Sequence, residues 1–180
     1  MRLFVGIPLA AAVIDQLSAT SQQLKSDGDG LRWPAPALWH VTLQFLGNAG
    51  REQYECSVAR LRELRLPPVP IRLEGLGFFD RAGIFFAGVQ VSPELLLLQE
   101  RVTKATEFCG FVPETRPYQP HITLARSKGQ RQGLFELKTK IHRQPNFPRF
   151  VAEEFVLYES FLGPAGSRYE VRERFLLGGR

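Results

Sequence analysis

Two of the three histidines in this chain of 180 residues lie in the same short pattern: histidine, any residue, threonine, leucine. His40 belongs to "LWHVTLQFLG" and His121 to "RPYQPHITLAR". Side chains alternate between the two faces of a strand, so each histidine shares a face with the threonine two residues later, Thr42 or Thr123. Each pattern therefore predicts a strand that presents an imidazole and a hydroxyl together, with apolar residues on its opposite face.

Two imidazoles and two hydroxyls that converge on one small space suit a phosphodiester. With an unperturbed pKa near ~6.5, one histidine can be protonated and the other neutral at neutral pH, as paired acid and base catalysis requires. The threonine hydroxyls can donate to non-bridging phosphate oxygens and stabilise charge in the transition state. One His-x-Thr alone is more often structural, but two copies at equivalent positions favour catalysis. The third histidine, His142, has no such context and is predicted to be exposed in a basic loop.

Other kinds of catalytic site have weaker support. Neither motif supplies a second His, Cys or carboxylate at ligand spacing, so a metal site is not expected. The sequence has no Gly-x-Ser-x-Gly and no Walker loop, which argues against a covalent hydrolase or an NTPase. Cys56 and Cys109 lie far apart, each in a segment typical of an amphipathic helix. They are predicted to be buried, reduced thiols of a cytoplasmic protein.

The elements that must position the two motifs form a repeat. A strand is expected from Arg2 and another from Gly83, and a motif histidine follows each start after 38 residues. Each half then has the order strand, helix, His-x-Thr strand, helix, strand, in lobes of about 1–80 and 81–180 within one domain. The expected strands are 2–7, 39–46, 69–76, 83–91, 121–126, 150–158 and 168–175; the helices follow Pro8, Gly50 and Pro93, and 131–140 is ambiguous.

Composition and charge narrow the possible partners. A hydrophobic fraction of 44% with 23% charged residues is ordinary for a globular protein and excludes disordered and collagen-like classes. The net charge is +5, and residues 116–149 hold eight Lys or Arg against one acid, Glu136. This basic excess fits a polyanionic partner, although a solvated basic face fits almost as well.

The first residues, "MRLFVGIPLAAAVIDQL", could pass for a signal peptide. Pro8 interrupts the apolar run, however, and Ile14, Leu17 and Leu24 continue it at helical spacing, so a strand and a helix are the better interpretation. No other apolar stretch approaches the length of a membrane span. The chain is therefore expected to have no contact with a membrane.

These stretches together resemble the 2H phosphoesterase superfamily, specifically the bacterial and archaeal branch called RNA 2′,3′-cyclic phosphodiesterase or 2′-5′ RNA ligase. "HVTLQFLG" and "RPYQPHITLAR" resemble its two signature motifs. "MRLFVGIPL", "LRWPAPALWH", "VLYES" and "RYEVRERF" also resemble that branch, so the similarity spans nearly the whole chain. The resemblance implies a bilobal α+β fold in which antiparallel sheets flank a central cleft.

The resemblance also implies an activity: hydrolysis of a 2′,3′-cyclic phosphate at an RNA 3′ end to a 2′-phosphate, without metal or other cofactor, and reversible 2′-5′ ligation. It makes His40 the proton donor, His121 the proton acceptor, and Thr42 and Thr123 phosphate ligands. The sequence itself does not separate donor from acceptor. The expected partners are RNA 3′ ends or cyclic nucleotides, and the expected state is a monomer. Two alternatives stay open: a 2H phosphoesterase acting on a cyclic ADP-ribose phosphate or a 2′-5′ oligonucleotide, and a non-catalytic RNA-binding module.

Four further residues lie near the motifs. Arg126 matches a basic position that ends the second motif in many members, which suggests phosphate binding. On a regular strand it would face away from His121, so it reaches phosphate only if the strand twists or ends there, and a surface role fits nearly as well. On a regular strand Phe45 would likewise face away from His40, so it is predicted to belong to the core. Pro117 and Pro120 are expected at the entry to an edge strand, where they leave His121 little backbone freedom.

Overall fold

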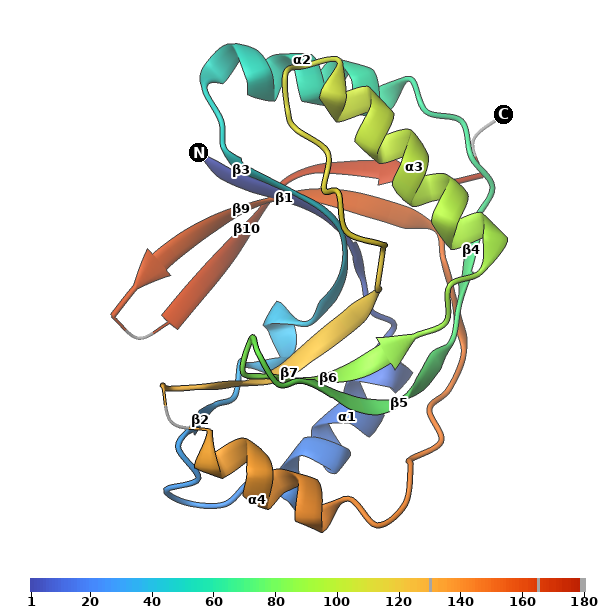
Figure 1. Ribbon diagram of the computed structural model, residues 1–180. Helices are drawn as coiled ribbons and strands as arrows, with labels where there is room; N and C mark the ends of the chain where they lie inside the picture. The colour runs from blue at the N-terminus through green and yellow to red at the C-terminus, as the bar shows by residue number, and fades with distance from the viewer. Residues whose placement is uncertain (130, 165, 179–180) are drawn as a thin grey trace.

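A computed structural model describes residues 1–129, 131–164 and 166–178 (Figure 1). In chain order the elements are β1 (Arg2–Pro8), α1 (Ala11–Leu24), β2 (Leu31–Arg32), the 3-10 helix η1 (Pro36–Leu38), β3 (His40–Asn48), α2 (Arg51–Arg62), β4 (Val69–Ile71), β5 (Leu73–Phe79), β6 (Ile84–Val89), α3 (Pro93–Glu107), β7 (His121–Ser127), α4 (Gln132–Lys140), β8 (Phe150–Ala152), β9 (Glu154–Gly163) and β10 (Gly166–Leu176). The predicted α+β class is confirmed.

Two four-stranded antiparallel sheets form the centre of the molecule. The first sheet has the order β10-β9-β1-β3 and the second has the order β2-β7-β6-β5, while β4 and β8 form a small third sheet. In Figure 1, α2 and α3 cover the outer face of the first sheet, and α1 and α4 lie beneath the second. The inner faces of the two sheets therefore turn toward each other.

The two halves of the sequence interleave in space. α1 follows β1 of the first sheet but lies beneath the second, whereas α3 follows β6 of the second sheet and packs against β3 of the first. In the same way, β5 of the first half joins the second sheet, and β9 of the second half joins the first. The repeat of element types is thus visible in the fold, but each sheet takes strands from both halves. The boundary near residue 80 therefore separates the two halves of the sequence but does not separate the two sheets.

The structure refines the expected elements at four places. Residues 69–76 and 150–158 each form two strands instead of one, because the chain leaves the small third sheet at Arg72 and Glu153 and joins a large sheet. The ambiguous segment 131–140 is a helix, α4. β2, which the sequence pattern did not suggest, pairs with the end of β7.

Local sequence explains the main elements. β1 lies between β3 and β9 and is buried along Leu3–Ile7, so it has the continuous apolar sequence of a central strand. The α3 helix begins at Pro93, and the Ser92 hydroxyl accepts a hydrogen bond from the Leu95 N–H at 3.1 Å. Among the described residues, no helix has the length and apolar character needed to cross a membrane.

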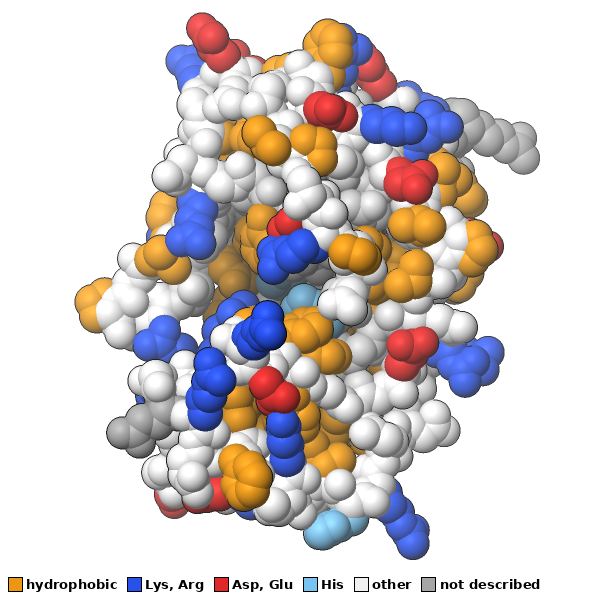
Figure 2. Space-filling view, viewed as in Figure 1, with side chains coloured by type: hydrophobic (Ala, Val, Ile, Leu, Met, Phe, Trp, Pro, Cys, Tyr) orange, Lys and Arg blue, Asp and Glu red, His pale blue; other side chains and the backbone are white. Residues whose placement is uncertain are grey.

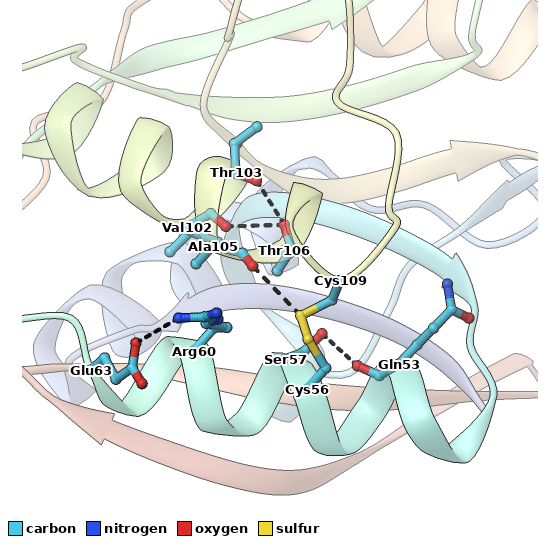
Figure 3. The surroundings of a disulfide bond; sticks show 10 residues. All are labelled: Gln53, Cys56, Ser57, Arg60, Glu63, Val102, Thr103, Ala105, Thr106 and Cys109. Carbon is cyan, nitrogen blue, oxygen red and sulfur yellow. Dashed lines mark hydrogen bonds and ion pairs between the residues drawn. A yellow bond between two sulfur atoms is a disulfide. The ribbon is translucent and has the colours of Figure 1, made fainter.

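A disulfide joins Cys56 of α2 to Cys109, two residues after the end of α3 (Figure 3). The Sγ atoms of Cys56 and Cys109 are 2.05 Å apart, so the expectation of reduced thiols is wrong. The two cysteines are 53 residues apart in sequence but meet because α2 and α3 pack side by side on the first sheet. Thr106, in the last turn of α3, donates a hydrogen bond to Gln44 Oε1 on β3 at 2.7 Å. The bridged helix pair therefore supports the strand that carries the first histidine.

Candidate active site

The two motif strands face each other across the space between the sheets. β3 is an edge strand of the first sheet, and β2 borders β7 only at Arg126 and Ser127, so the His121 end of β7 is an open edge among the described residues. Cα atoms of β3 and β7 approach within 8 Å. The Tyr118 hydroxyl, just before β7, donates to the Thr42 carbonyl oxygen at 2.9 Å. Figure 2 shows histidine surface inside a hollow of this face, with Lys and Arg side chains around it.

Both histidines are held by the same backbone contact. His40 Nδ1 lies 2.8 Å from the Leu38 carbonyl oxygen, and His121 Nδ1 lies 2.8 Å from the Gln119 carbonyl oxygen. Because a carbonyl oxygen can only accept, Nδ1 carries a proton in each ring. Nε2 is then the nitrogen available for proton exchange, at equivalent places in the two halves.

The two threonines differ in their present contacts. Thr42 Oγ1 lies 3.0 Å from His40 Nε2, so this histidine and its threonine share a face as the sequence predicts. The Thr123 hydroxyl is half-buried and has no hydrogen-bond partner among the described residues. It is therefore available to a ligand, as is His121 Nε2 beside it on the same face.

Aromatic rings surround His40. The Phe4 ring centroid is 4.7 Å from the His40 ring centroid, and those of Tyr158 and Tyr169 are 5.9 and 5.5 Å away. Gly6 leaves the room for this packing: a Cβ there would lie 3.0 Å from the Val41 carbonyl oxygen and 3.3 Å from His40 Cδ2. The three rings belong to "MRLFVGIPL", "VLYES" and "RYEVRERF", which resemble the family. Sequence patterns alone did not indicate that these rings line a site.

Two phenylalanines enclose His121. The ring centroid of Phe79 is 4.9 Å away and that of Phe86 is 5.4 Å away, and these two rings stack at 4.2 Å. Sequence reasoning missed both. The only available signal was the apolar character of two strands, which is typical of any buried sheet.

Burial and nearby cations disfavour the charged form of both imidazoles. Burial, with the positive charges of His121 and Arg126, lowers the pKa of His40 to about 4. Burial and the charge of Arg126 also lower the pKa of His121. Both rings are therefore neutral at pH 7 in the free protein, and the expected pair of one charged and one neutral imidazole requires a bound anion, which would raise both pKa values.

A β-bulge in each motif strand changes the face on which the later residues lie. In β3 the pairing with β1 skips Leu43, and in β7 the pairing with β6 skips Leu124. In both strands the next residue is buried as well, Gln44 or Ala125, so the alternation is displaced by one position after it, until a second shift in β3 at Leu46.

The bulges place Phe45 and Arg126 on the same faces as the histidines, five positions after His40 and His121 respectively. Phe45 is 69% exposed, so the prediction that it belongs to the core is wrong. Arg126 is also exposed, and its charge acts on the pKa of both histidines. The parity objection to Arg126 therefore does not hold, because the strand is not regular.

The remaining predicted residues lie as follows. Pro117 is exposed, and Pro120 is buried with its carbonyl oxygen accepting from the Val89 N–H at 3.0 Å, which extends the β6–β7 pairing to the residue before His121. His142 is exposed, as predicted. Among the described residues, no group of three or more His, Cys, Asp or Glu could hold a metal ion.

Comparison with known families gives a match that includes both motif strands. The 2′-5′ RNA ligase superfamily matches residues 8–161, a range that includes both histidine motifs. The chain belongs to this superfamily. Among superfamily relatives, an Archaeoglobus fulgidus protein named RNA 2′,3′-cyclic phosphodiesterase is 28% identical over 173 residues, which cover 94% of this chain and 97% of that protein. A Thermus thermophilus protein of the same name is 30% identical, over 99% of this chain and 91% of its own.

Solved structures agree with the superfamily assignment. Escherichia coli LigT, crystallised with 3′-AMP, superposes with a TM-score of 0.84 at 25% identity, covering 99% of this chain and 98% of LigT. A Thermus thermophilus protein superposes with a TM-score of 0.83 at 30% identity and covers 99% of both chains. The predicted resemblance and its bilobal α+β fold are therefore confirmed.

Proposed function

We propose that this protein hydrolyses the 2′,3′-cyclic phosphate at an RNA 3′ end to a 2′-phosphate. One observation carries the proposal: two imidazoles, each held by a carbonyl at Nδ1, lie on facing strands whose Cα atoms approach within 8 Å, and Arg126 is near enough to lower the pKa of both. The relatives named RNA 2′,3′-cyclic phosphodiesterase, aligned over nearly the whole chain, support the choice of substrate.

In the proposed reaction the two histidines act from opposite sides of the phosphorus atom. His121 Nε2 takes a proton from a water molecule, whose oxygen forms a bond to phosphorus. The bond between phosphorus and O3′ breaks, and His40 Nε2–H gives its proton to O3′. The products are a free 3′ hydroxyl and a 2′-phosphate. One proton enters at His121 and one leaves from His40, so the pair must be reset before the next turnover.

The other polar groups would bind the phosphate. The Thr123 hydroxyl can donate to one non-bridging oxygen, and the Thr42 hydroxyl can donate to another once the substrate replaces its present contact with His40 Nε2. Arg126 would add two parallel N–H donors and a positive charge that favours the dianionic transition state. The anion would also raise the pKa of His40, which supplies the proton that this residue must donate.

Several finer expectations belong to the same proposal. An RNA 5′ hydroxyl in place of water would give the 2′-5′ ligation, although hydrolysis is expected to dominate because ligation needs two docked RNA ends. No cofactor is needed, since both proton transfers are assigned to side chains. A monomeric, cytoplasmic protein stays a prediction; the disulfide is more typical of oxidising compartments and of hyperthermophiles.

The test is turnover of a 2′,3′-cyclic mononucleotide and a cyclic-ended RNA in EDTA, with phosphorus NMR of the product. The expected product is the 2′-phosphate, and His40→Ala or His121→Ala should each lower kcat by about 10³-fold. His142→Ala is the matched control, because His142 is an exposed histidine outside the cleft. No turnover, or turnover that requires metal, would contradict the proposal.

The same experiment separates the alternatives. Faster turnover of a cyclic ADP-ribose phosphate or a 2′-5′ oligonucleotide would assign a different ester to the same histidines. Tight, salt-dependent RNA binding without turnover, unchanged by either histidine substitution, would indicate a binding module.

A further inference from the structure

Two arginines lie directly opposite each other on the cleft face of the second sheet. Arg32 of β2 pairs with Arg126 of β7, and opposite residues of an antiparallel pair project to the same face. Both are exposed, and within the described residues neither side chain has an acidic partner. Like charges at such positions destabilise a sheet. The pair is therefore suited to bind anions.

Arg32 also lines a hollow of about 480 Å³ that extends beyond the arginine pair. Its walls are the segment 25–33 after α1, Lys128 after β7, and Pro164. Pro164 lies in the turn between β9 and β10 of the first sheet, whereas Lys128 follows β7 of the second (Figure 1). Residues next to both sheets therefore line the hollow. Lys25 and Lys128 are exposed along it.

The acidic residues of the hollow leave its positive charge in excess. Asp29 accepts hydrogen bonds from the Leu31 N–H and from Trp33 Nε1, each at 2.8 Å, so its carboxylate holds the loop together. Asp27 is the one other acid among the lining residues, against two lysines and an arginine. A polyanion that enters the hollow therefore meets more positive than negative charge.

We propose that Arg32, Lys128 and Lys25 form a track for the backbone phosphates of RNA upstream of its cyclic end. This inference rests on the proposed function, which places the cyclic phosphate between the histidines. The 5′ phosphodiester of that last nucleotide then has to leave the cleft along one of its walls. Arg32 is suited to receive it, because opposite Cα atoms in an antiparallel pair are only about 4.5–5.5 Å apart.

The position of Arg126 supports this order along the track. Arg126 lies on the same face of β7 as His121, and its charge lowers the pKa of both histidines, so we place it on the side of the reacting phosphate. Arg32 is one strand farther out, and Lys25 and Lys128 lie beyond it in the hollow. The track contacts phosphates and no base edges, so it favours RNA ends over cyclic mononucleotides without reading sequence.

The test is the ratio of kcat/KM for cyclic-ended RNA to kcat/KM for a 2′,3′-cyclic mononucleotide, from about 50 to about 250 mM KCl. Di- and tetranucleotides are compared. The wild-type ratio should exceed one and fall with salt. Arg32→Gln should lower it about tenfold for both RNAs and reduce the log–log salt slope by about 0.7, as expected for one lost phosphate contact. Lys128→Gln should lower it for the tetranucleotide only.

Arg101→Gln is the matched control, because Arg101 is exposed on α3 at the outer side of the first sheet; it should keep the wild-type ratio. A wild-type ratio of one, or a ratio that Arg32→Gln leaves unchanged, overturns the track and leaves the proposed function standing. Absence of turnover on every substrate removes both. Without RNA, Arg32→Gln should raise Tm, since one of two opposed charges is gone. A lowered Tm would show that Arg32 is structural and overturn the track.

Discussion

Gly6 is the residue that allows His40 to lie against β1. It pairs with Thr42, and a side chain there would meet the Val41 carbonyl oxygen at 3.0 Å and His40 Cδ2 at 3.3 Å. The backbone oxygen cannot move without disturbing the β1–β3 pairing, so the imidazole has to shift. We expect Gly6→Ala to lower kcat/KM by at least about tenfold and stability by about 1–2 kcal/mol.

Gly50→Ala is the control for this prediction, because Gly50 has open space around it and an ordinary negative φ. Steady-state kinetics and urea unfolding would be measured on both variants. If Gly6→Ala loses stability but keeps wild-type kcat/KM, the glycine serves strand packing alone and does not position His40.

At the scale of elements, the motif strands show where sequence reasoning succeeds and where it stops. Alternation predicts that each histidine shares a face with its threonine, and His40 with Thr42 bears this out. It fails beyond the bulges, at Phe45 and Arg126, because a strand pattern assumes one residue per position in the partner strand. Two successive buried residues are the mark of each bulge. In β3 the second buried residue is the polar Gln44, whose type does not suggest burial, so the bulge is not evident from the sequence.

The bridged pair of helices carries a prediction of its own. The disulfide closes a loop with a sequence separation of 53 residues, for which chain entropy gives about 4 kcal/mol of stabilisation, and measured values commonly reach about 2–4 kcal/mol. We expect the double variant Cys56→Ser, Cys109→Ser to have a free energy of unfolding that is lower by that amount. Its urea midpoint should be lower accordingly. Because α2 and α3 cover the outer face of the first sheet, turnover at 25 °C should change little.

Dithiothreitol gives the matched comparison. It should shift the wild-type urea curve toward that of the double variant and leave the double variant unaffected. Coincident wild-type curves with and without the reductant would show that the bridge contributes no stability, and a loss of turnover in the folded variant would place the helix pair in the catalytic machinery.

At the scale of the whole molecule, the interleaved halves could not be predicted from the sequence. The equal separation of 38 residues between the first strand and the motif histidine of each half indicates two equivalent motifs, but not that α1 and α3 exchange sheets or that β4 pairs with β8. Such contacts join residues far apart in sequence, and local patterns carry no information about them. Because β3 faces β7, the charge of Arg126 on β7 lowers the pKa of His40 as well as that of His121, which has a consequence for pH dependence.

The pH profiles of kcat/KM and kcat should differ. The active form of the free enzyme has one charged and one neutral imidazole. Both pKa values lie below the usual 6.5. The value of kcat/KM should therefore fall about tenfold per pH unit above pH 6.5. A bound phosphate anion favours the charged imidazole and raises both pKa values, so the alkaline limb of kcat should lie about one pH unit higher or more. Initial rates with a cyclic mononucleotide between about pH 4.5 and 9 would measure both.

Arg126→Gln tests the cause of this difference. Removal of the guanidinium charge takes away one of the interactions that lower the pKa of His40 and His121. The alkaline limb of kcat/KM should therefore move to higher pH even though its maximum falls, because a phosphate ligand has also been lost. A combination of lower maximum and unmoved limb would mean that Arg126 binds phosphate without acting on the histidines. Coincident limbs of kcat and kcat/KM in the wild type would mean that the substrate phosphate does not lie between the two rings.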